Sequence, residues 1–292
     1  MNLLFSITEN YTKQLRTTLF SIRANNPQDA FDVYLILDGY LSKQVNDLSD
    51  FCRSLNMKLH LIQIPEKLFA KAPKTKRYPK TIYYRLIAQN FLPDSLDRIL
   101  YLDCDLICLN PFGAFYHLDF ENKLYAAASH FENIKISSTF NKIRLGNYDS
   151  DNYFNSGVLL MNLKMLRQKI NINDIYAYIE KNSLQLLLPD QDVLNALYGN
   201  QIKSVADTYY NYDTRYFSAY KLLNDGLTDL DWIMKHTVFL HFCGPYKPWN
   251  KSYNRKFAAL YKHYEWVANR DSLDKNETDQ GLKPSVDNKQ PL

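Results

Sequence analysis

Two aspartates with one residue between them directly follow a short apolar run. Asp103 and Asp105 stand in the segment YLDCDLIC. Residues two apart in an extended chain point the same way, so the two carboxylates share a side and Cys104 faces the opposite one. Neighbouring negative charges are costly unless something neutralises them. Because carboxylate oxygens favour hard divalent cations, we interpret the pair as a metal site for Mn²⁺ or Mg²⁺, with a surface turn as the alternative.

A histidine ends another apolar run much later in the chain. His241 opens the segment HFCGPYKPWN, and its imidazole would complete an Asp-Asp-His ligand set typical of Mn²⁺. Gly244 lets the backbone approach a ligand closely, and Lys247 places an ammonium group beside it. We therefore interpret this segment as a phosphate-binding loop. A structural histidine at a strand end is the alternative.

Two further segments place polar groups beside apolar ones. In PDQD, Asp190 and Gln191 stand at the predicted start of a helix, where Asp190 is expected to be the N-cap residue. In FNSGV, Asn155 and Gly157 interrupt an apolar run. This interruption indicates either a turn or a polar side chain held beside closely approaching backbone.

These side chains need a scaffold, and the first third of the chain alternates apolar strands with helices. Strands are predicted at 2–7, 31–37, 59–64 and 98–102, and helices at 11–25, 43–56 and 81–92. Strands that are apolar on both faces are typical of a parallel sheet covered by helices. Ligands bind such sheets at the carboxyl ends of the strands, where the two aspartates are predicted to lie.

The rest of the chain is more mixed. A strand followed by a helix is predicted at 153–166, a helix at 190–199, a strand at 237–242 and an aromatic, basic amphipathic helix at 252–270. Residues 271–292 carry almost no large apolar side chain and are expected to be disordered. The expected organisation is a catalytic domain at 1–250, a helix at 251–270 and a tail at 271–292.

Composition limits the partners and the compartment. The formal net charge is +4 over 292 residues, so no nucleic-acid partner is expected. A local basic run at 71–85 suits a phosphate-bearing ligand or an anionic surface. Neither a signal peptide nor a run of about 18 apolar residues is found, which favours a cytoplasmic protein with reduced thiols. The aromatic, basic helix fits two interpretations equally: peripheral contact with anionic lipid on the inner membrane face, and packing against the domain.

Four segments together carry a resemblance to a known family. YLDCDLIC, YFNSGVLLMNL, LPDQDVLN and HFCGPYKPW, in this order and spacing, resemble glycosyltransferase family 8, from FSITENY to about Trp249. The chain is similar to bacterial lipopolysaccharide α-galactosyltransferases and to general-stress-protein-type members. The resemblance implies a GT-A fold, which is an α/β fold with a Rossmann-like, mostly parallel sheet and helices on both faces. It also implies retaining transfer of a hexose from UDP-galactose or UDP-glucose, with Mn²⁺, to a glycan, lipid-linked, cell-envelope or glycoprotein acceptor.

The resemblance also implies roles for individual residues. The metal ligands would be Asp103, Asp105 and His241, and the diphosphate contacts Gly244 and Lys247. The remaining donor-binding residues would be Phe5, Ser6, Thr8, Asn10, Tyr11, Arg85 and Cys104. The residues around the sugar would be Arg85, His130, Asn155, Ser156, Asp190 and Gln191, with Gln191 beside the anomeric carbon. The sequence departs from the family at Thr8, where an aspartate is common, and at His130, where galactosyltransferase-type members have an aspartate. The identity of the donor sugar therefore stays open.

The expected mechanism follows from the residue beside the anomeric carbon. Retaining glycosidases use a carboxylate nucleophile, but Gln191 is an amide and a poor nucleophile. Same-face attack is therefore favoured, with Asp190 as a transient nucleophile in the alternative. Two other functions remain open: a metal-dependent nucleotidyltransferase or pyrophosphorylase, and an inactive sugar-nucleotide-binding module. The first should show a glycine-rich loop that FSITENYTK lacks, and the complete set of polar residues argues against the second.

Overall fold

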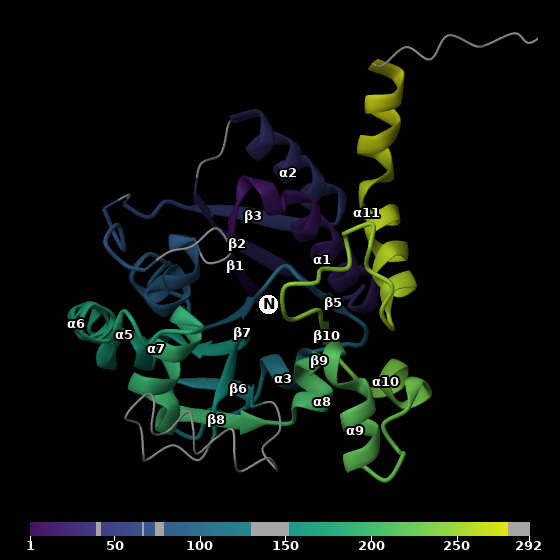
Figure 1. The fold of residues 1–292 in the computed structure, drawn as a ribbon. Coiled ribbons are helices and arrows are strands. Elements are labelled where there is room, and N and C mark those ends of the chain that lie inside the picture. The colour runs from purple at the N-terminus through teal and green to yellow at the C-terminus, as the bar shows by residue number, and fades with distance from the viewer. Residues whose placement is uncertain (39–41, 66, 74–78, 130–151, 280–292) are drawn as a thin grey trace, which may run out of the picture.

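The computed structural model describes residues 1–38, 42–65, 67–73, 79–129 and 152–279 (Figure 1). Within these residues, a seven-stranded sheet forms the centre of the fold. Its strands, in spatial order, are β3 (Met57–Ile62), β2 (Phe31–Asp38), β1 (Asn2–Thr8), β4 (Arg98–Leu102), β7 (Phe154–Asn162), β6 (Tyr125–Ser129) and β8 (Ile202–Val205). The first four are mutually parallel, β7 is antiparallel to both neighbours, and β8 is parallel to β6. The predicted α/β fold around a mostly parallel sheet is confirmed.

Helices cover both faces of this sheet. Successive strand residues point to opposite sides, and apolar side chains on both sides pack against helices. Leu3 and Phe5 of β1 pack into one apolar core with α1 and α2, whereas Leu4 packs into the core on the other face. The helices are α1 (Thr12–Asn25), α2 (Ser42–Ser54), α3 (Gly113–Tyr116), α5 (Leu163–Lys169), α6 (Ile172–Asn182), α7 (Pro189–Tyr198), α8 (Asp207–Tyr210), α9 (Phe217–Leu223), α10 (Leu230–His236) and α11 (Ala258–Asp279). In Figure 1, α5, α6 and α7 lie on the left and α8, α9 and α10 at the lower right.

A second, small sheet lies beside the large one. Its strands are, in spatial order, β5 (Leu106–Cys108), β10 (Phe239–His241) and β9 (Tyr212–Asp213). β10 runs antiparallel to β5 and parallel to β9. Since β5 follows β4 after only three residues, this small sheet holds the end of β10 close to the end of β4.

The segment predicted as a helix at 81–92 differs from the prediction. It forms two 3₁₀ helices, Lys80–Leu86 and Ala88–Asn90. Backbone carbonyls here accept hydrogen bonds from side chains: Thr81 from Ser6 Oγ at 2.9 Å, and Ile82 from Arg85 Nε at 3.1 Å. Tertiary contacts with the centre of the molecule thus override the helical period that the sequence suggests. Two strands are also shifted or shorter than predicted, β3 at Met57–Ile62 and β10 at Phe239–His241.

The last helix also has other bounds than predicted. α11 begins at Ala258 rather than 252 and continues to Asp279, past residue 271, where disorder was expected; residues 280–292 lie outside the described part of the chain. Phe257 and Tyr261 are buried in a core shared with the small sheet, whereas Trp266 is 59% exposed. The packing alternative therefore accounts for part of the aromatic face, and membrane contact stays a prediction.

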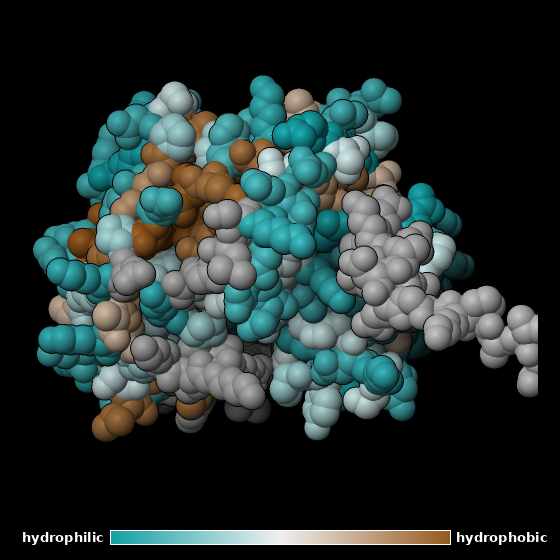
Figure 2. Space-filling model, turned by 90° about the horizontal axis from the view of Figure 1, so that it is seen from above, coloured by the Kyte–Doolittle hydropathy of each residue, from teal (hydrophilic) through white to brown (hydrophobic). Residues whose placement is uncertain are grey.

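None of the helices in the described part of the chain is both long enough and apolar enough to cross a membrane. Seen from above in Figure 2, the surface is largely hydrophilic, with one hydrophobic region at the upper left.

Candidate active site

A cavity of about 260 Å³ opens where the two sheets meet. The predicted site residues that line it are Ser6, Thr8, Tyr11, Arg85, Asp103, Cys104, Asp105, Asn155, Ser156, Asp190, Gln191, His241, Gly244 and Lys247. They come from the ends of β1, β4 and β10, from the start of β7 and from the first turn of α7, together with the segments that adjoin them. The chain thus brings residues from widely separated stretches of sequence to the sheet edge that the strand pattern predicted.

Two predicted residues, Phe5 and Asn10, do not join this wall, and a third lies outside the described part of the chain. Phe5 is fully buried in the core behind β1, so its side chain faces away from the cavity. Its neighbours Ser6 and Thr8 point to the other side of the strand, and both line the cavity. Asn10 is exposed and is not among the lining residues. His130 lies outside the described residues, and so does the part of the basic run at 74–78.

The two aspartates and the histidine meet as predicted. Asp103 directly follows β4, and its backbone N–H still donates to Gly157 O at 2.8 Å. Asp105 precedes β5, and its backbone carbonyl accepts from Phe242 N–H at 2.9 Å, which ties it to the residue after His241. One ligand atom from each of Asp103, Asp105 and His241 lies within 4.8 Å of the other two.

Gly157 makes room for this group. A Cβ atom at this position in β7 would lie 2.4 Å from His241 Cε1 and 2.7 Å from Asp103 Oδ2, closer than real contacts allow. The segment that the sequence left open between a turn and a close approach is therefore a continuous strand with a close approach. Two carboxylates and an imidazole around this hollow fit a divalent cation such as Mn²⁺, and Asp103, Asp105 and His241 would hold it.

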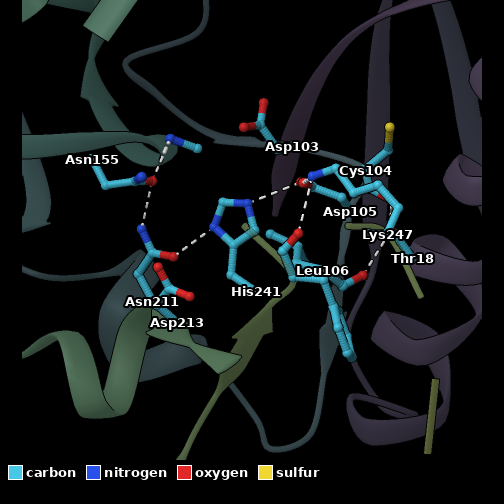
Figure 3. Close-up of polar contacts among 12 residues, drawn as sticks. Thr18, Asp103, Cys104, Asp105, Leu106, Asn155, Asn211, Asp213, His241 and Lys247 are labelled. Carbon is cyan, nitrogen blue, oxygen red and sulfur yellow. Dashed lines mark hydrogen bonds and ion pairs between the residues drawn. The ribbon is translucent and has the colours of Figure 1, made fainter. Parts of the chain in front are cut away.

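Asp105 lies between His241 and Lys247 (Figure 3). Its Oδ1 lies 2.9 Å from His241 Nε2, and its Oδ2 accepts a hydrogen bond from Lys247 Nζ. Burial by itself raises the pKa of Asp105, but Lys247 and His241 outweigh burial and hold this pKa far below its usual range. Burial likewise lowers the pKa of His241, but Cys243 and Asp105 overcome that and raise it well above its ordinary value. The site therefore holds a stable carboxylate at neutral pH.

Arg85 links Asp103 to Asp190 across the cavity. This buried guanidinium lies 3.0 Å from Asp103 Oδ1 through Nη2 and 3.3 Å from Asp190 Oδ2 through Nε. Its Nη1 donates to Ser156 O at 2.9 Å, and its Cζ lies 4.3 Å from the ring centroid of Tyr101. One fixed cation thus sets the spacing between the two carboxylates.

The first turn of α7 differs from the prediction. Asp190 is not the N-cap: that position is Leu188, and no side chain caps it. Asp192 Oδ2 instead accepts from the backbone N–H groups of Leu187 and Leu188, at 2.7 and 3.0 Å. Asp190 is thereby left to accept from Ser156 Oγ at 2.8 Å, and burial raises its pKa.

Gln191 is held through its amide oxygen. Gln191 Oε1 accepts from Asn155 Nδ2 at 3.3 Å and from Ser156 N–H at 3.4 Å. These bonds engage the amide oxygen, which is the atom that a nucleophilic amide would use.

Sequence reasoning missed several residues of the site, among them Tyr101 and Arg215. Tyr101 OH donates to Asp103 Oδ1 at 2.8 Å, and a signal for it existed, because residues two apart in a strand share a face. Arg215 lines the cavity and is fixed by buried Asp213, with Nη2 2.6 Å from Asp213 Oδ2. Its Nη1 would lie 3.0 Å from a Cβ at Gly244, where φ is +90°. No motif marked Arg215, because its place depends on the pairing of β9 with β10.

Comparison with known proteins now decides the family. The model of the family described as "Glycosyl transferase family 8" matches residues 2–252. The chain belongs to glycosyl transferase family 8. The chain is 29% identical over 277 residues to lipopolysaccharide 1,2-glucosyltransferase of Escherichia coli, with 90% of this chain and 77% of that protein covered. It is 24% identical over 276 residues to general stress protein A of Bacillus subtilis, covering 90% of this chain and 92% of that protein.

A solved structure supports the fold assignment. The galactosyltransferase LgtC, solved in complex with donor and acceptor sugar analogs, superposes with a TM-score of 0.77 at 22% identity, covering 91% of this chain and 96% of that chain. The family 8 member described here is thus a glycosyltransferase with a GT-A fold, as the four sequence segments predicted.

Proposed function

We propose that this family 8 enzyme transfers a hexose, galactose or glucose, from its UDP derivative to a hydroxyl group of a lipopolysaccharide-type glycan. Transfer would retain the configuration at the anomeric carbon and depend on Mn²⁺, with Mg²⁺ as the alternative. The observation that carries the proposal is the cavity in which Asp103, Asp105 and His241 meet Gln191 and Lys247. The lipopolysaccharide 1,2-glucosyltransferase and 1,3-galactosyltransferase among the relatives support the acceptor class.

The charged residues of the cavity suit a departing diphosphate. Breaking the sugar–phosphate bond develops negative charge on the leaving group, and fixed positive charge stabilises it. The Lys247 ammonium is oriented by Phe242 O at 3.0 Å, and Gly244 lets the backbone approach the phosphates. When bound, a divalent cation would supply further charge stabilisation to the same diphosphate. Ser6, Thr8 and Tyr11, at the end of β1, are the proposed contacts of the nucleoside.

The sugar side of the cavity favours same-face attack. A retaining reaction through a covalent intermediate needs a free carboxylate beneath the anomeric carbon. Asp190 is engaged with Ser156 Oγ and Arg85, and the Gln191 oxygen is engaged as well. We therefore propose that the acceptor hydroxyl attacks on the face that the diphosphate leaves, and that a departing phosphate oxygen takes the acceptor proton.

The test measures UDP release from UDP-galactose and UDP-glucose, with Mn²⁺, Mg²⁺ or EDTA, and with truncated lipopolysaccharide as acceptor. Asp103→Ala and Asp105→Ala should lower kcat/KM by about 1000-fold, because each removes a ligand of a cation that contributes several kcal/mol. Gln191→Ala should keep measurable activity. Asp50→Ala is the matched control, because its exposed carboxylate on α2 pairs with the neighbouring Arg53 at the surface.

Several outcomes would contradict the proposal. Full activity of Asp105→Ala in EDTA would remove the metal assignment. An inverted anomeric configuration in the product, read from its NMR coupling constant, would contradict retention. Release of pyrophosphate instead of UDP would favour the nucleotidyltransferase alternative, and binding of UDP-sugar without turnover on any acceptor would favour the inactive binding module.

A further inference from the structure

A chain of side-chain amides runs behind the cavity and ends at His241 (Figure 3). Gly157 N–H donates to Asn155 Oδ1 at 2.9 Å, and Asn211 Nδ2 donates to the same oxygen at 2.9 Å. Asn211 Oδ1 lies 2.8 Å from His241 Nδ1. Asn211 is fully buried and does not line the cavity, so it cannot contact a substrate directly.

The direction of every bond in this chain follows from its first member. A backbone N–H can only donate, so the atom of Asn155 that faces Gly157 must be the amide oxygen. Because that oxygen also faces Asn211, the Asn211 amide turns its nitrogen toward it. The Asn211 oxygen then faces His241, and an amide oxygen can only accept. His241 Nδ1 must therefore carry a proton.

A proton on Nδ1 decides what the other ring nitrogen can do. His241 Nε2 is the nitrogen that lies 2.9 Å from Asp105 Oδ1, on the side of the two carboxylates. In the neutral ring with Nδ1 protonated, Nε2 keeps its lone pair and can ligate a cation. With the proton on Nε2 instead, the lone pair would face Asn211 and the ring would be lost as a ligand.

We propose that Asn211 is a positioning residue that keeps His241 protonated on Nδ1 and so makes Nε2 the metal-ligating nitrogen. Asn211 acts through His241, and the Gly157 backbone N–H supplies the direction. This inference rests on the proposed metal dependence of the enzyme. Partners of this kind behind metal-bound histidines typically contribute about 10–100-fold to metal affinity.

The first test is Mn²⁺ affinity, measured without any sugar donor from the EPR signal of free Mn²⁺. Asn211→Leu keeps a similar side-chain volume but removes the acceptor, so affinity should fall by about 10–100-fold. Asn211→Asp keeps an oxygen facing Nδ1 and should retain more affinity than Asn211→Leu. Asn162→Leu is the matched control. Asn162 lies on β7, as Asn155 and Gly157 do, but at the opposite end of the strand from the cavity, and its side chain makes two hydrogen bonds. It should lower Tm and leave Mn²⁺ affinity unchanged.

The second test reads the proton directly in the wild-type protein. Protein labelled with ¹⁵N-histidine is saturated with diamagnetic Mg²⁺, and the two-bond couplings of each imidazole show which nitrogen is protonated. The His241 signal is the one that is lost in His241→Gln. We expect the Nδ1–H form for His241 in the wild type and a changed pattern in Asn211→Leu.

The outcomes separate this inference from the function proposed above. An Nε2–H ring in the Mg²⁺-loaded wild type overturns the role of Asn211, as does equal Mn²⁺ affinity in the wild type and a folded Asn211→Leu. Either result leaves sugar transfer intact. A wild type that binds metal with the expected ring form but transfers no sugar would instead contradict only the proposed function.

Discussion

The two sides of the cavity are built on different principles. The first side comes from parallel strands β1 and β4, whose ends deliver Ser6, Asp103 and Asp105. The second comes from antiparallel β7, helix α7 and the small sheet, which deliver amides and an imidazole. On the first side, the strand itself sets where a charged group stands. On the second, a side chain reaches its working position only through other side chains.

The first side supplies charged groups, and the second supplies groups whose orientation must be fixed. The carboxylates need only a strand end, because two residues of the same face emerge together. His241, Asn155 and Gln191 need hydrogen-bond partners that fix which atom points inward. Substitutions on the first side should remove a function outright, whereas those on the second should change it by degrees. The variants below test this division from the largest expected effect to the smallest.

Gly157→Ala should have the largest effect, because this residue of β7 lies against both Asp103 of the first side and His241 of the second. The new Cβ would meet His241 Cε1 at 2.4 Å and Asp103 Oδ2 at 2.7 Å, so both ligands must move. We expect Mn²⁺ affinity to fall by more than about 100-fold, the upper range for disturbing the surroundings of a metal site, with nearly complete loss of transfer. Titration of Mn²⁺ by EPR checks the first effect.

The control for this variant is Gly113→Ala in α3. A Cβ there has no atom within 4 Å, so the change should be neutral or stabilise the helix by about 0.5–1 kcal/mol. Wild-type Mn²⁺ affinity in Gly157→Ala would show that the ligands tolerate displacement and that the space left by Gly157 is not needed.

Asp190→Asn tests whether a buried carboxyl group on the second side lowers the stability of the fold while it supports transfer. Burial raises the pKa of Asp190, so the folded protein binds this proton more tightly than the unfolded chain does. The stability that this adds is present below the ordinary aspartate pKa and is lost as the pH rises through the folded value. The amide of the variant does not titrate, so the Tm of the wild type should fall relative to that of the variant as the pH rises above about 4, the ordinary pKa of an aspartate.

The same substitution should lower transfer by about 100-fold, a typical loss for one oriented polar group at a reacting centre. Tm is measured by calorimetry in EDTA, so that metal binding does not contribute. A difference in Tm that stays constant with pH would mean that Asp190 does not carry a raised pKa.

Cysteine labelling should show the smallest effect of the tests, because it changes no residue. It compares how accessible the buried thiols and Cys243 are to a reagent. Burial raises the pKa of Cys52 and of Cys108 to about 12, and Cys104 is buried as well. These three buried thiols should resist iodoacetamide at about pH 8, because the thiolate is the reactive form. Cys243 is partly exposed at the cavity wall and should react first. UDP with Mn²⁺ should slow that reaction, as followed by peptide mass spectrometry; equal labelling with and without UDP would place the nucleotide elsewhere.

The sequence predicted the first side well for a physical reason. Apolar runs and their alternation fix the strands, and strand ends fix Asp103, Asp105 and the buried side of Cys104. Where tertiary contacts decide, prediction failed: the 3₁₀ segment Lys80–Leu86 is tied to β1 by the bond of Ser6 to Thr81 and to β7 by the bond of Arg85 to Ser156. The expected capping role of Asp190 was also wrong: the N-cap position is Leu188, and Asp192 accepts from the N–H groups of Leu187 and Leu188, which precede the helix.

Asn211 shows the limit of such reasoning. It belongs to no motif, and nothing in its local pattern separates it from a buried structural asparagine. Its place beside His241 arises because β9 pairs with β10, two strands of two and three residues. Pairing of such short strands leaves too weak a periodic signal to be read from composition or spacing.

The packing of α11 on α1 bears on the order in which the molecule assembles. Asn269 Nδ2 donates to Thr17 Oγ1, and Arg16 Nη2 donates to Ala268 O, so each contact joins residues 252 positions apart. Contacts between such distant residues close large loops and form late in folding. During synthesis, the face of α1 that α11 covers would therefore stay exposed until almost the whole described chain has left the ribosome. This face is where a chaperone would have the longest access.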